Sequence, residues 1–171
     1  GLPPARPTPC RPNSRPPGLR PALPNPRPVR KPAQAENSAA GYSRRVSIDL
    51  EALYIDLHRH PELSFQETRT AGVIARELGA LGLEVVEGLG KTGVATAITG
   101  GAGDGPVVWL RADMDGLPVA EQTGLAYAST ARGTDPAGTD VPVMHACGHD
   151  MHVTALLGAL EKLAQTRDEW S

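Results

Sequence analysis

The sequence predicts an α/β fold with a partly parallel sheet, because helical and strand-like patterns alternate along the chain. Three observations carry this prediction. Apolar residues recur at helical spacing in three segments. Short runs of strand-forming residues lie between the second and third of these segments. One of these runs leads directly into two aspartates, at the place where ligands bind in open α/β sheets.

The first helix is predicted near the start of the folded body, which begins at about Tyr42. Four apolar residues at helical spacing indicate it: Val46, Leu50, Leu53 and Leu57. Pro61 follows the end of the pattern. His58 and His60 lie at this helix end, where positive charge is favourable, so we interpret them as capping residues and not as metal ligands.

The second helix is predicted to start at a capping box, in which Ser64 accepts a hydrogen bond from the backbone N–H of Glu67 and Glu67 reaches back. Gly82 is expected to end it. Its apolar face consists of Ala71, Ile74, Ala75, Leu78 and Leu81.

Three strands are expected next, over residues 83–86, 93–99 and 106–112, the last of them buried. Residues 120–142 are rich in Gly, Thr, Ala and Asp and are predicted to be loop. The stretch GLGKTG, residues 88–93, resembles a phosphate-binding loop. The full pattern requires glycine where Val85 stands and a helix afterwards, so we reject nucleotide binding.

Charge and proline content separate a tail from this body. Residues 1–35 contain 12 prolines, seven basic residues and no acidic residue, whereas the rest carries 10 basic and 19 acidic residues. Dense proline prevents helical hydrogen bonding and leaves little to bury, which predicts a disordered tail over residues 1–41. The tail has no aromatic residues for nucleic-acid binding. No apolar run reaches the roughly 18 residues of a membrane span.

Only two cysteines are present, Cys10 in the tail and Cys147 in the body, which is not a disulfide framework. This usage is typical of a reducing compartment, and we expect a cytoplasmic location.

The stretch MHACGHDMH, residues 144–152, concentrates side chains that bind metals. Cys147 and His149 are two residues apart, so a loop presents them together better than one helix face does. Asp150 is a natural N-cap for a third helix over residues 153–164. Thiolate and imidazole suit Zn²⁺ and accept Mn²⁺, Co²⁺ or Ni²⁺. A buried cysteine beside a hydrogen-bonding histidine is the structural alternative.

Asp113 and Asp115 follow the third predicted strand. Two carboxylates at this spacing could hold a cation or orient its ligands. Both could equally be ordinary turn residues, because aspartate is common in turns.

Three stretches in this order, DLHRHPELSFQE, RADMDGLPVAEQTGL and MHACGHDMHVTALLGA, resemble the hippurate-hydrolase branch of the aminoacylase-like zinc metallopeptidases. The resemblance covers about residues 45–165. It implies the N-terminal part of an α/β catalytic domain with a central mixed sheet. It also implies a lid domain, not contained in this chain, through which such proteins form homodimers.

The resemblance further implies a site with two divalent ions, in which Cys147 and His149 are metal ligands and Asp115 is the catalytic carboxylate that orients a ligand. Asp113 stands where related branches place a histidine ligand, and Asp150 lies close to the site. The family's later Glu-Glu pair and two further histidine ligands have no counterpart here. We therefore expect residues 42–171 to be an incomplete catalytic domain.

The activity implied for the complete protein is metal-dependent hydrolysis of the amide bond of N-acyl amino acids. Two alternatives remain open. One is an amidase with Cys147 as nucleophile and His149 or His152 as base. The other is a truncated fragment without catalytic activity.

Overall fold

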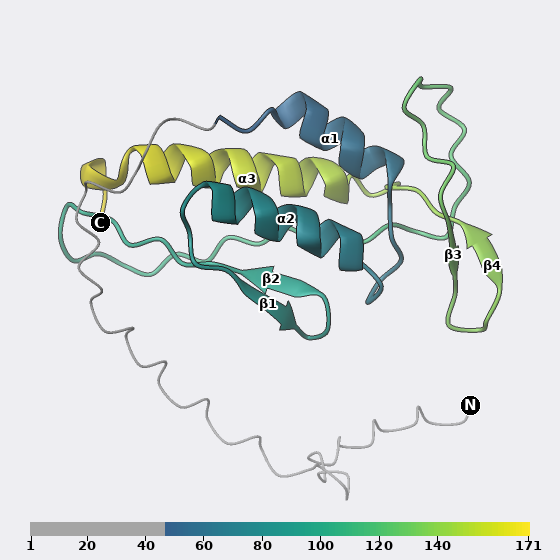
Figure 1. The fold of residues 1–171 in the computed structure, drawn as a ribbon, viewed down its shortest axis with the longest axis horizontal. Helices are drawn as coiled ribbons and strands as arrows, with labels where there is room; N and C mark the ends of the chain where they lie inside the picture. Colours follow the sequence, from purple (N-terminus) through teal and green to yellow (C-terminus); the bar gives the residue numbers. More distant parts are fainter. Residues whose placement is uncertain (1–46) are drawn as a thin grey trace, which may run out of the picture. The chain divides into compact units, whose positions relative to one another are not determined.

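The computed structural model describes residues 47–171. The tail predicted over residues 1–41 lies outside this range. Three helices and two small sheets make up the described part (Figure 1). No helix among these residues has both the length and the apolar character needed to cross a membrane.

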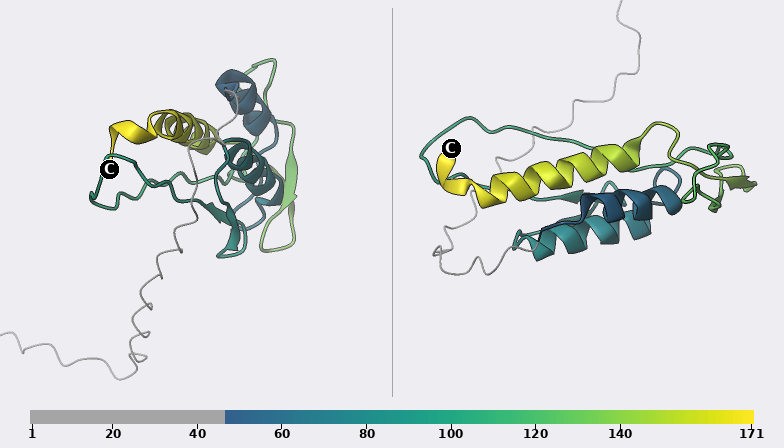
Figure 2. Two further views of the ribbon diagram at one scale, coloured as in Figure 1. Left: turned by 60° about the vertical axis from the view of Figure 1, so that its left-hand side comes forward. Right: turned by 90° about the horizontal axis from the view of Figure 1, so that it is seen from above.

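The helices are α1 (Leu50–Arg59), α2 (Thr68–Ala80) and α3 (His149–Gln165), followed by the short 3-10 helix η2 (Arg167–Glu169). Helix α3 packs against both α1 and α2, and a view from above shows it lying beside that pair (Figure 2). All three helices predicted from apolar periodicity are confirmed. Helix α1 begins later than its pattern because Asp49 caps it, its carboxylate accepting the backbone N–H of Ala52 at 3.0 Å.

The capping box predicted for α2 is wrong. Glu67 is the N-cap residue but makes no side-chain capping bond, and its carboxylate instead accepts the Thr92 hydroxyl at 2.6 Å. The cap comes from Glu62, whose two oxygens accept the backbone N–H groups of Arg69 and Thr70 at 2.9 and 2.7 Å. A carboxylate reaching both free N–H groups also suits the positive end of the helix dipole, which explains why Ser64 is not needed.

The end of α2 follows the prediction. Gly82 has a φ of 72°, a left-handed conformation that glycine adopts without strain. The Leu83 N–H then bonds to the Leu78 carbonyl at 3.1 Å, which closes the helix in the manner of a Schellman motif.

Strands β1 (Val86–Leu89) and β2 (Gly93–Ala95) form an antiparallel pair beside α2. Strand β1 lies three residues beyond its predicted start, and β2 is shorter than predicted. The GLGKTG stretch forms the end of β1, the turn and the first residue of β2. A strand therefore follows this stretch, as the rejection of a phosphate loop required.

The buried strand predicted over residues 106–112 is wrong for this structure. These residues belong to no strand, and Val107, Val108 and Trp109 are 84%, 73% and 89% exposed. A strand exists only through hydrogen bonds to a neighbour, and no segment within residues 47–171 pairs with this one. The apolar pattern alone could not reveal this absence.

The loop predicted over residues 120–142 contains an antiparallel hairpin, β3 (Arg132–Thr134) with β4 (Asp140–Pro142). Its turn is organised by Asp135, whose Oδ1 accepts the backbone N–H groups of Ala137 and Thr139 at 2.9 and 2.8 Å. Gly138, with a φ of 85°, completes the turn. The D-P-A-G sequence is a turn signal of this kind, which was available in the sequence but not used.

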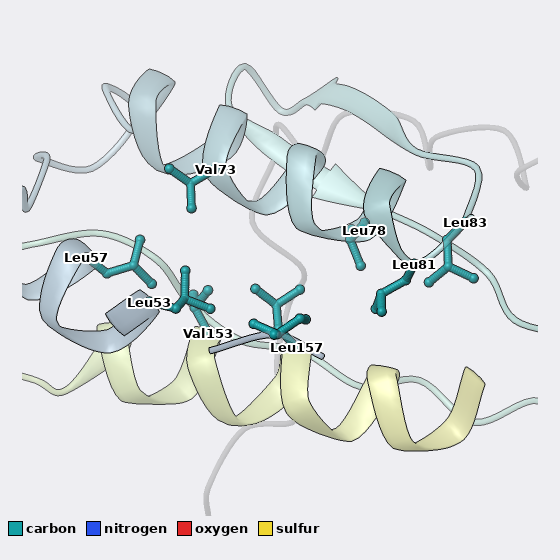
Figure 3. Packing of buried hydrophobic residues seen from close by; sticks show 9 residues of the cluster. Leu53, Leu57, Val73, Leu78, Leu81, Leu83, Val153 and Leu157 are labelled. Carbon is teal, nitrogen blue, oxygen red and sulfur yellow. The ribbon is translucent and has the colours of Figure 1, made fainter. Parts of the chain in front are cut away.

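The core lies where α1 and α3 meet α2 (Figure 3). Leu57 and Leu157 are 0% and 2% exposed, so truncation of either to alanine should cost about 2–5 kcal/mol of stability. The buried cluster consists of Ile48, Leu53, Leu57, Val73, Leu78, Leu81, Leu83, Val153 and Leu157. This packing fixes the first turn of α3, where the predicted metal ligand His149 is located.

Two isolated bridges connect the aspartate segment to the residues before α3 and to those after α1. Leu117 and Met144 exchange two backbone hydrogen bonds of 2.9 and 3.0 Å in antiparallel fashion. Gly116 pairs in parallel with Leu63 and donates its N–H to the Glu62 carbonyl at 2.6 Å. Gly116 has no room for a side chain, because an added Cβ would lie 2.9 Å from both Pro61 and Val143.

Candidate metal half-site

The predicted metal ligands lie at the start of α3. Gly148 is the N-cap residue, with a left-handed φ of 75°, and His149 is the first helical residue. Cys147 therefore stands just outside the helix and is exposed, whereas His149 is half-buried. The turn at Gly148 separates the thiol from the regular helix, which agrees with the expectation that a loop presents this pair.

Asp115 holds the His149 ring. The His149 Nδ1 lies 2.9 Å from the Asp115 Oδ1 and 3.0 Å from the backbone carbonyl of the same residue. A carbonyl oxygen can only accept, so Nδ1 carries the hydrogen and the lone pair of the neutral ring lies on Nε2. Metal-binding histidines are commonly oriented through their second nitrogen in this way. The structure therefore brings Asp115 and His149 together, 34 residues apart in the chain.

The other predicted neighbours do not join them. Asp113 pairs with Arg111, whose Nη2 lies 2.6 Å from its Oδ1, and both side chains are largely exposed. The two aspartates therefore have different partners, and they do not form a common cation site with each other. His152 is exposed, with its ring centroid 5.5 Å from that of His149.

Asp150 is not the N-cap, so that prediction is wrong. It lies in the first turn of α3 and is only 2% exposed. Its Oδ2 lies 2.7 Å from the Nδ1 of His58, and its Oδ1 accepts the Met151 N–H at 2.9 Å. A buried partner on another helix has recruited the carboxylate that an isolated helix would have used as a cap.

His58 was interpreted from the sequence as a helix-capping residue, but its ring nitrogens contact two carboxylates and no carbonyl of α1. It is buried at the end of α1 and touches Asp150 on one side and Glu121 on the other, with its Nε2 3.1 Å from the Glu121 Oε1. Its ring also packs against Tyr54 and Tyr127, with centroids 5.6 and 5.3 Å away. Its position next to Leu57 on the apolar stripe of α1 was the available signal of burial.

Opposing effects act on the pKa values of His58 and Glu121. Burial lowers the pKa of His58, but its hydrogen bonds to Glu121 and Asp150 outweigh burial, and the pKa lies above the ordinary 6.5. Burial raises the pKa of Glu121, but hydrogen bonds from Thr123, Ser129 and His58 hold that pKa below the ordinary 4.5. The positive form of His58 is therefore favoured between two negative carboxylates.

His145 was also missed. It is 5% exposed, and neither ring nitrogen has a hydrogen-bond partner among the described residues. Burial lowers the pKa of His145, so the neutral ring is favoured. It lies two residues before the cysteine in the sequence, but nothing in the local pattern distinguishes it from the other histidines.

The residues present fit half of a metal site. Cys147 offers an exposed sulfur, and His149 offers Nε2 in a ring oriented by Asp115. A catalytic zinc site usually has three protein ligands and one open position. Residues 47–171 contain no group of three or more His, Cys, Asp or Glu side chains arranged to hold an ion.

Residues 109–171 match the sequence model of Peptidase family M20/M25/M40. This match contains Asp115, Cys147 and His149. The chain carries part of an M20 peptidase domain. The M20 match confirms the family resemblance deduced from the motifs.

Relatives of known name support the same assignment. N-acetylcysteine deacetylase of Bacillus subtilis is 46% identical over 115 residues, covering 67% of this chain and 28% of the relative. Hippurate hydrolase of Campylobacter jejuni is 43% identical over 116 residues, covering 68% and 28%. The chain therefore spans little more than a quarter of the length of these relatives.

A crystal structure of a dinuclear metal-binding M20-family peptidase from Bacillus subtilis has a TM-score of 0.61 to this chain. The two are 43% identical, and the alignment covers 70% of this chain and 31% of the other. The predicted α/β fold class is confirmed by this likeness. The partly parallel sheet expected from the sequence does not form within residues 47–171, where both sheets are antiparallel pairs. The predicted enzyme class, a metal-dependent amidohydrolase, agrees with the family and with these relatives.

Proposed function

We propose that Cys147 and His149 form one half of a divalent metal centre in an enzyme that hydrolyses the amide bond of N-acyl amino acids. The observation that carries this proposal is the Asp115–His149 contact of 2.9 Å, which leaves the His149 Nε2 without a hydrogen bond among the described residues, two residues along the chain from an exposed thiol. The deacetylase and hydrolase names of the relatives support the substrate class.

Each residue of this half-site has a distinct role in the proposal. Cys147 and His149 bind the metal, and Asp115 fixes the orientation of the His149 ring. Two ions per complete site are proposed, supported by the dinuclear M20 peptidase of similar fold. Zn²⁺, Mn²⁺, Co²⁺ and Ni²⁺ all suit this donor pair. When bound, such ions supply Lewis-acid activation of water and of the amide carbonyl.

Three further features belong to the same proposal. Residues 42–171 form the N-terminal portion of the catalytic domain, and the remaining ligands come from polypeptide beyond them. The complete enzyme forms a homodimer through a lid domain, as the resemblance implies. A reducing, cytoplasmic location is supported by the free thiol of Cys147.

The alternative of a cysteine nucleophile has less support from the geometry. Such a mechanism needs a base within hydrogen-bond reach of the thiol. No hydrogen bond joins Cys147 to His149 or His152 in the described part of the chain, and the hydrogen of His149 Nδ1 points to Asp115.

A Co²⁺ titration of the 171-residue chain tests the ligand assignment. Binding should produce thiolate-to-cobalt charge-transfer absorption, and Cys147→Ser should abolish it, because a hydroxyl is a much poorer ligand than a thiolate. Cys10→Ser is the matched control and should leave the absorption unchanged. Unchanged absorption in Cys147→Ser would show that this cysteine is not a ligand.

Released amine from hippurate and N-acetyl amino acids tests the reaction. In the full-length enzyme, a chelator should abolish turnover and added metal should restore it. If the metal-depleted protein stays active and iodoacetamide then abolishes its turnover, the thiol mechanism would be favoured instead. The 171-residue chain should show no turnover, since the resemblance places the general base outside residues 42–171 and such a base alone contributes roughly 10²–10⁴ in rate.

A further inference from the structure

His58 lies between two carboxylates that come from different parts of the chain. Its Nδ1 is 2.7 Å from Asp150 and its Nε2 is 3.1 Å from Glu121. The three side chains are 7%, 2% and 0% exposed, so the group is buried as a unit. We call these three residues the histidine clamp.

The chemistry of the clamp favours a doubly protonated ring. Ionised carboxylates only accept hydrogen bonds, so each ring nitrogen must donate. Charge-assisted hydrogen bonds of this kind are shorter and stronger than neutral ones. The raised pKa of His58 agrees with this geometry.

The Glu121 carboxylate is itself fixed by further contacts. Glu121 accepts the Ser129 N–H at 2.5 Å and also the Thr123 hydroxyl. The Ser129 hydroxyl in turn donates to the Val143 carbonyl at 2.7 Å, just before the metal-binding motif. The clamp therefore joins the end of α1, the loop from residue 121 to 129 and the first turn of α3.

Within residues 47–171, two side-chain contacts tie the first turn of α3 to other segments, His149 to Asp115 and Asp150 to His58. The N-cap of α3 is Gly148, which has no side chain with which to cap the helix. Asp150 is the first-turn residue that is tied to another helix, and it follows His149 directly. A shift of Asp150 would therefore move His149 relative to Asp115.

We propose that His58, through its contacts with Asp150 and Glu121, is a positioning residue that holds Cys147 and His149 in the geometry required for metal binding. This inference rests on the proposed function. His58 does not touch the proposed ligands and acts only through the first turn of α3. Replacing a residue that orients a metal ligand without binding the metal itself commonly lowers metal affinity by about 10–100-fold.

The test compares His58→Gln with His60→Gln in the 171-residue chain. His60 is the matched control, because it is an exposed histidine two residues further on whose Nδ1 donates to the Asp56 carbonyl. For each variant, Co²⁺ affinity is measured from the thiolate-to-cobalt absorption. The His149 ring nitrogens are observed by ¹⁵N NMR without metal, and thermal melting reports on folding.

His58→Gln should weaken Co²⁺ binding by about tenfold or more. In the metal-free protein, it should also remove the preference for hydrogen on the His149 Nδ1. His60→Gln should change neither quantity. Glu121→Gln keeps an acceptor for His58 but loses the charge, so it should weaken binding less than His58→Gln does.

A folded His58→Gln variant with wild-type Co²⁺ affinity and an unchanged His149 spectrum would overturn the inference. If that variant does not fold, Glu121→Gln decides in the same way. If the wild-type chain gives no thiolate absorption, the proposed metal site has failed. The ¹⁵N spectra of His149 in the metal-free His58→Gln and His60→Gln variants then still decide whether His58 positions the first turn of α3.

Discussion

The roles of individual side chains in the half-site were partly predictable from the sequence. The short spacing of Cys147 and His149, together with Asp115 after a strand-like run, indicated a metal site, and the structure joins Asp115 to His149 at 2.9 Å. The role of Asp150 was mispredicted because its partner, His58, is 92 residues away. Local capping preferences describe an isolated helix and carry no information about so distant a partner.

Asp115→Asn tests the orientation of His149. Asparagine keeps the size of the side chain but removes its negative charge, so the hold on Nδ1 should weaken. Metal affinity should fall by about 10–100-fold, as expected for a residue that hydrogen-bonds to a metal-binding histidine. Asp113→Asn is the control, since Asp113 pairs with exposed Arg111 and has no contact with His149 among the described residues. Equal Co²⁺ affinities for both variants would contradict the assigned role of Asp115.

The pH dependence of stability should reveal the histidine clamp. The pKa of His58 is raised, so its contribution to stability is complete below its unfolded value of about 6.5 and is lost as pH rises through the folded pKa. The pKa of Glu121 is lowered, so its contribution is present above about 4.5 and is lost as pH falls through the folded value. The clamp therefore stabilises the fold most between these two limits.

Urea unfolding at a series of pH values measures this effect. The difference in free energy of unfolding between wild type and His58→Gln should be largest between about pH 4.5 and 6.5 and should shrink on the alkaline side. Taking the difference removes the opposite trend from His145, whose pKa is lowered by burial. A difference that grows with rising pH would show that His58 is not held as a cation.

Secondary structure was predictable where it depends on local pattern. The helices follow from apolar residues at helical spacing, which needs no knowledge of distant partners. The stretch from Val107 to Leu110 has an equally strong apolar pattern, but no strand forms because no described segment pairs with it. The hairpin of β3 and β4 was missed because its strands are only three residues long and its turn signal, around Asp135, was disregarded.

The corrected cap of α2 gives a prediction for this helix. Glu62→Ala leaves the backbone N–H groups of Arg69 and Thr70 without their acceptor. Stability should fall by about 1 kcal/mol, within the 0.5–2 kcal/mol usual for a lost cap. Ser64→Ala should have no measurable effect. A larger loss for Ser64→Ala than for Glu62→Ala in urea unfolding would restore the capping box.

The whole chain presents an unusual apolar surface. Val107, Val108, Trp109 and Leu110 are consecutive and between 53% and 89% exposed. Unpaired apolar segments of this kind are prone to associate edge to edge. We therefore expect concentration-dependent self-association of the 171-residue chain.

Sedimentation velocity measures this association. Val108→Lys should shift the chain towards monomer, because a charge on an exposed edge opposes pairing. Val119→Lys is the matched control, since Val119 is 44% exposed but lies outside the apolar stretch. Equal association of wild type and both variants would show that residues 107–110 are not the contact.

X-ray absorption at the zinc edge of the Zn²⁺-loaded 171-residue chain tests the metal half-site most directly. The proposal predicts one sulfur neighbour at about 2.3 Å, from Cys147, and a nitrogen neighbour at about 2.0–2.1 Å, from His149, with solvent in the remaining positions. The sulfur neighbour should remain in Cys10→Ser and disappear in Cys147→Ser. A spectrum with only oxygen and nitrogen neighbours in the wild-type chain would contradict the assignment of Cys147 as a metal ligand.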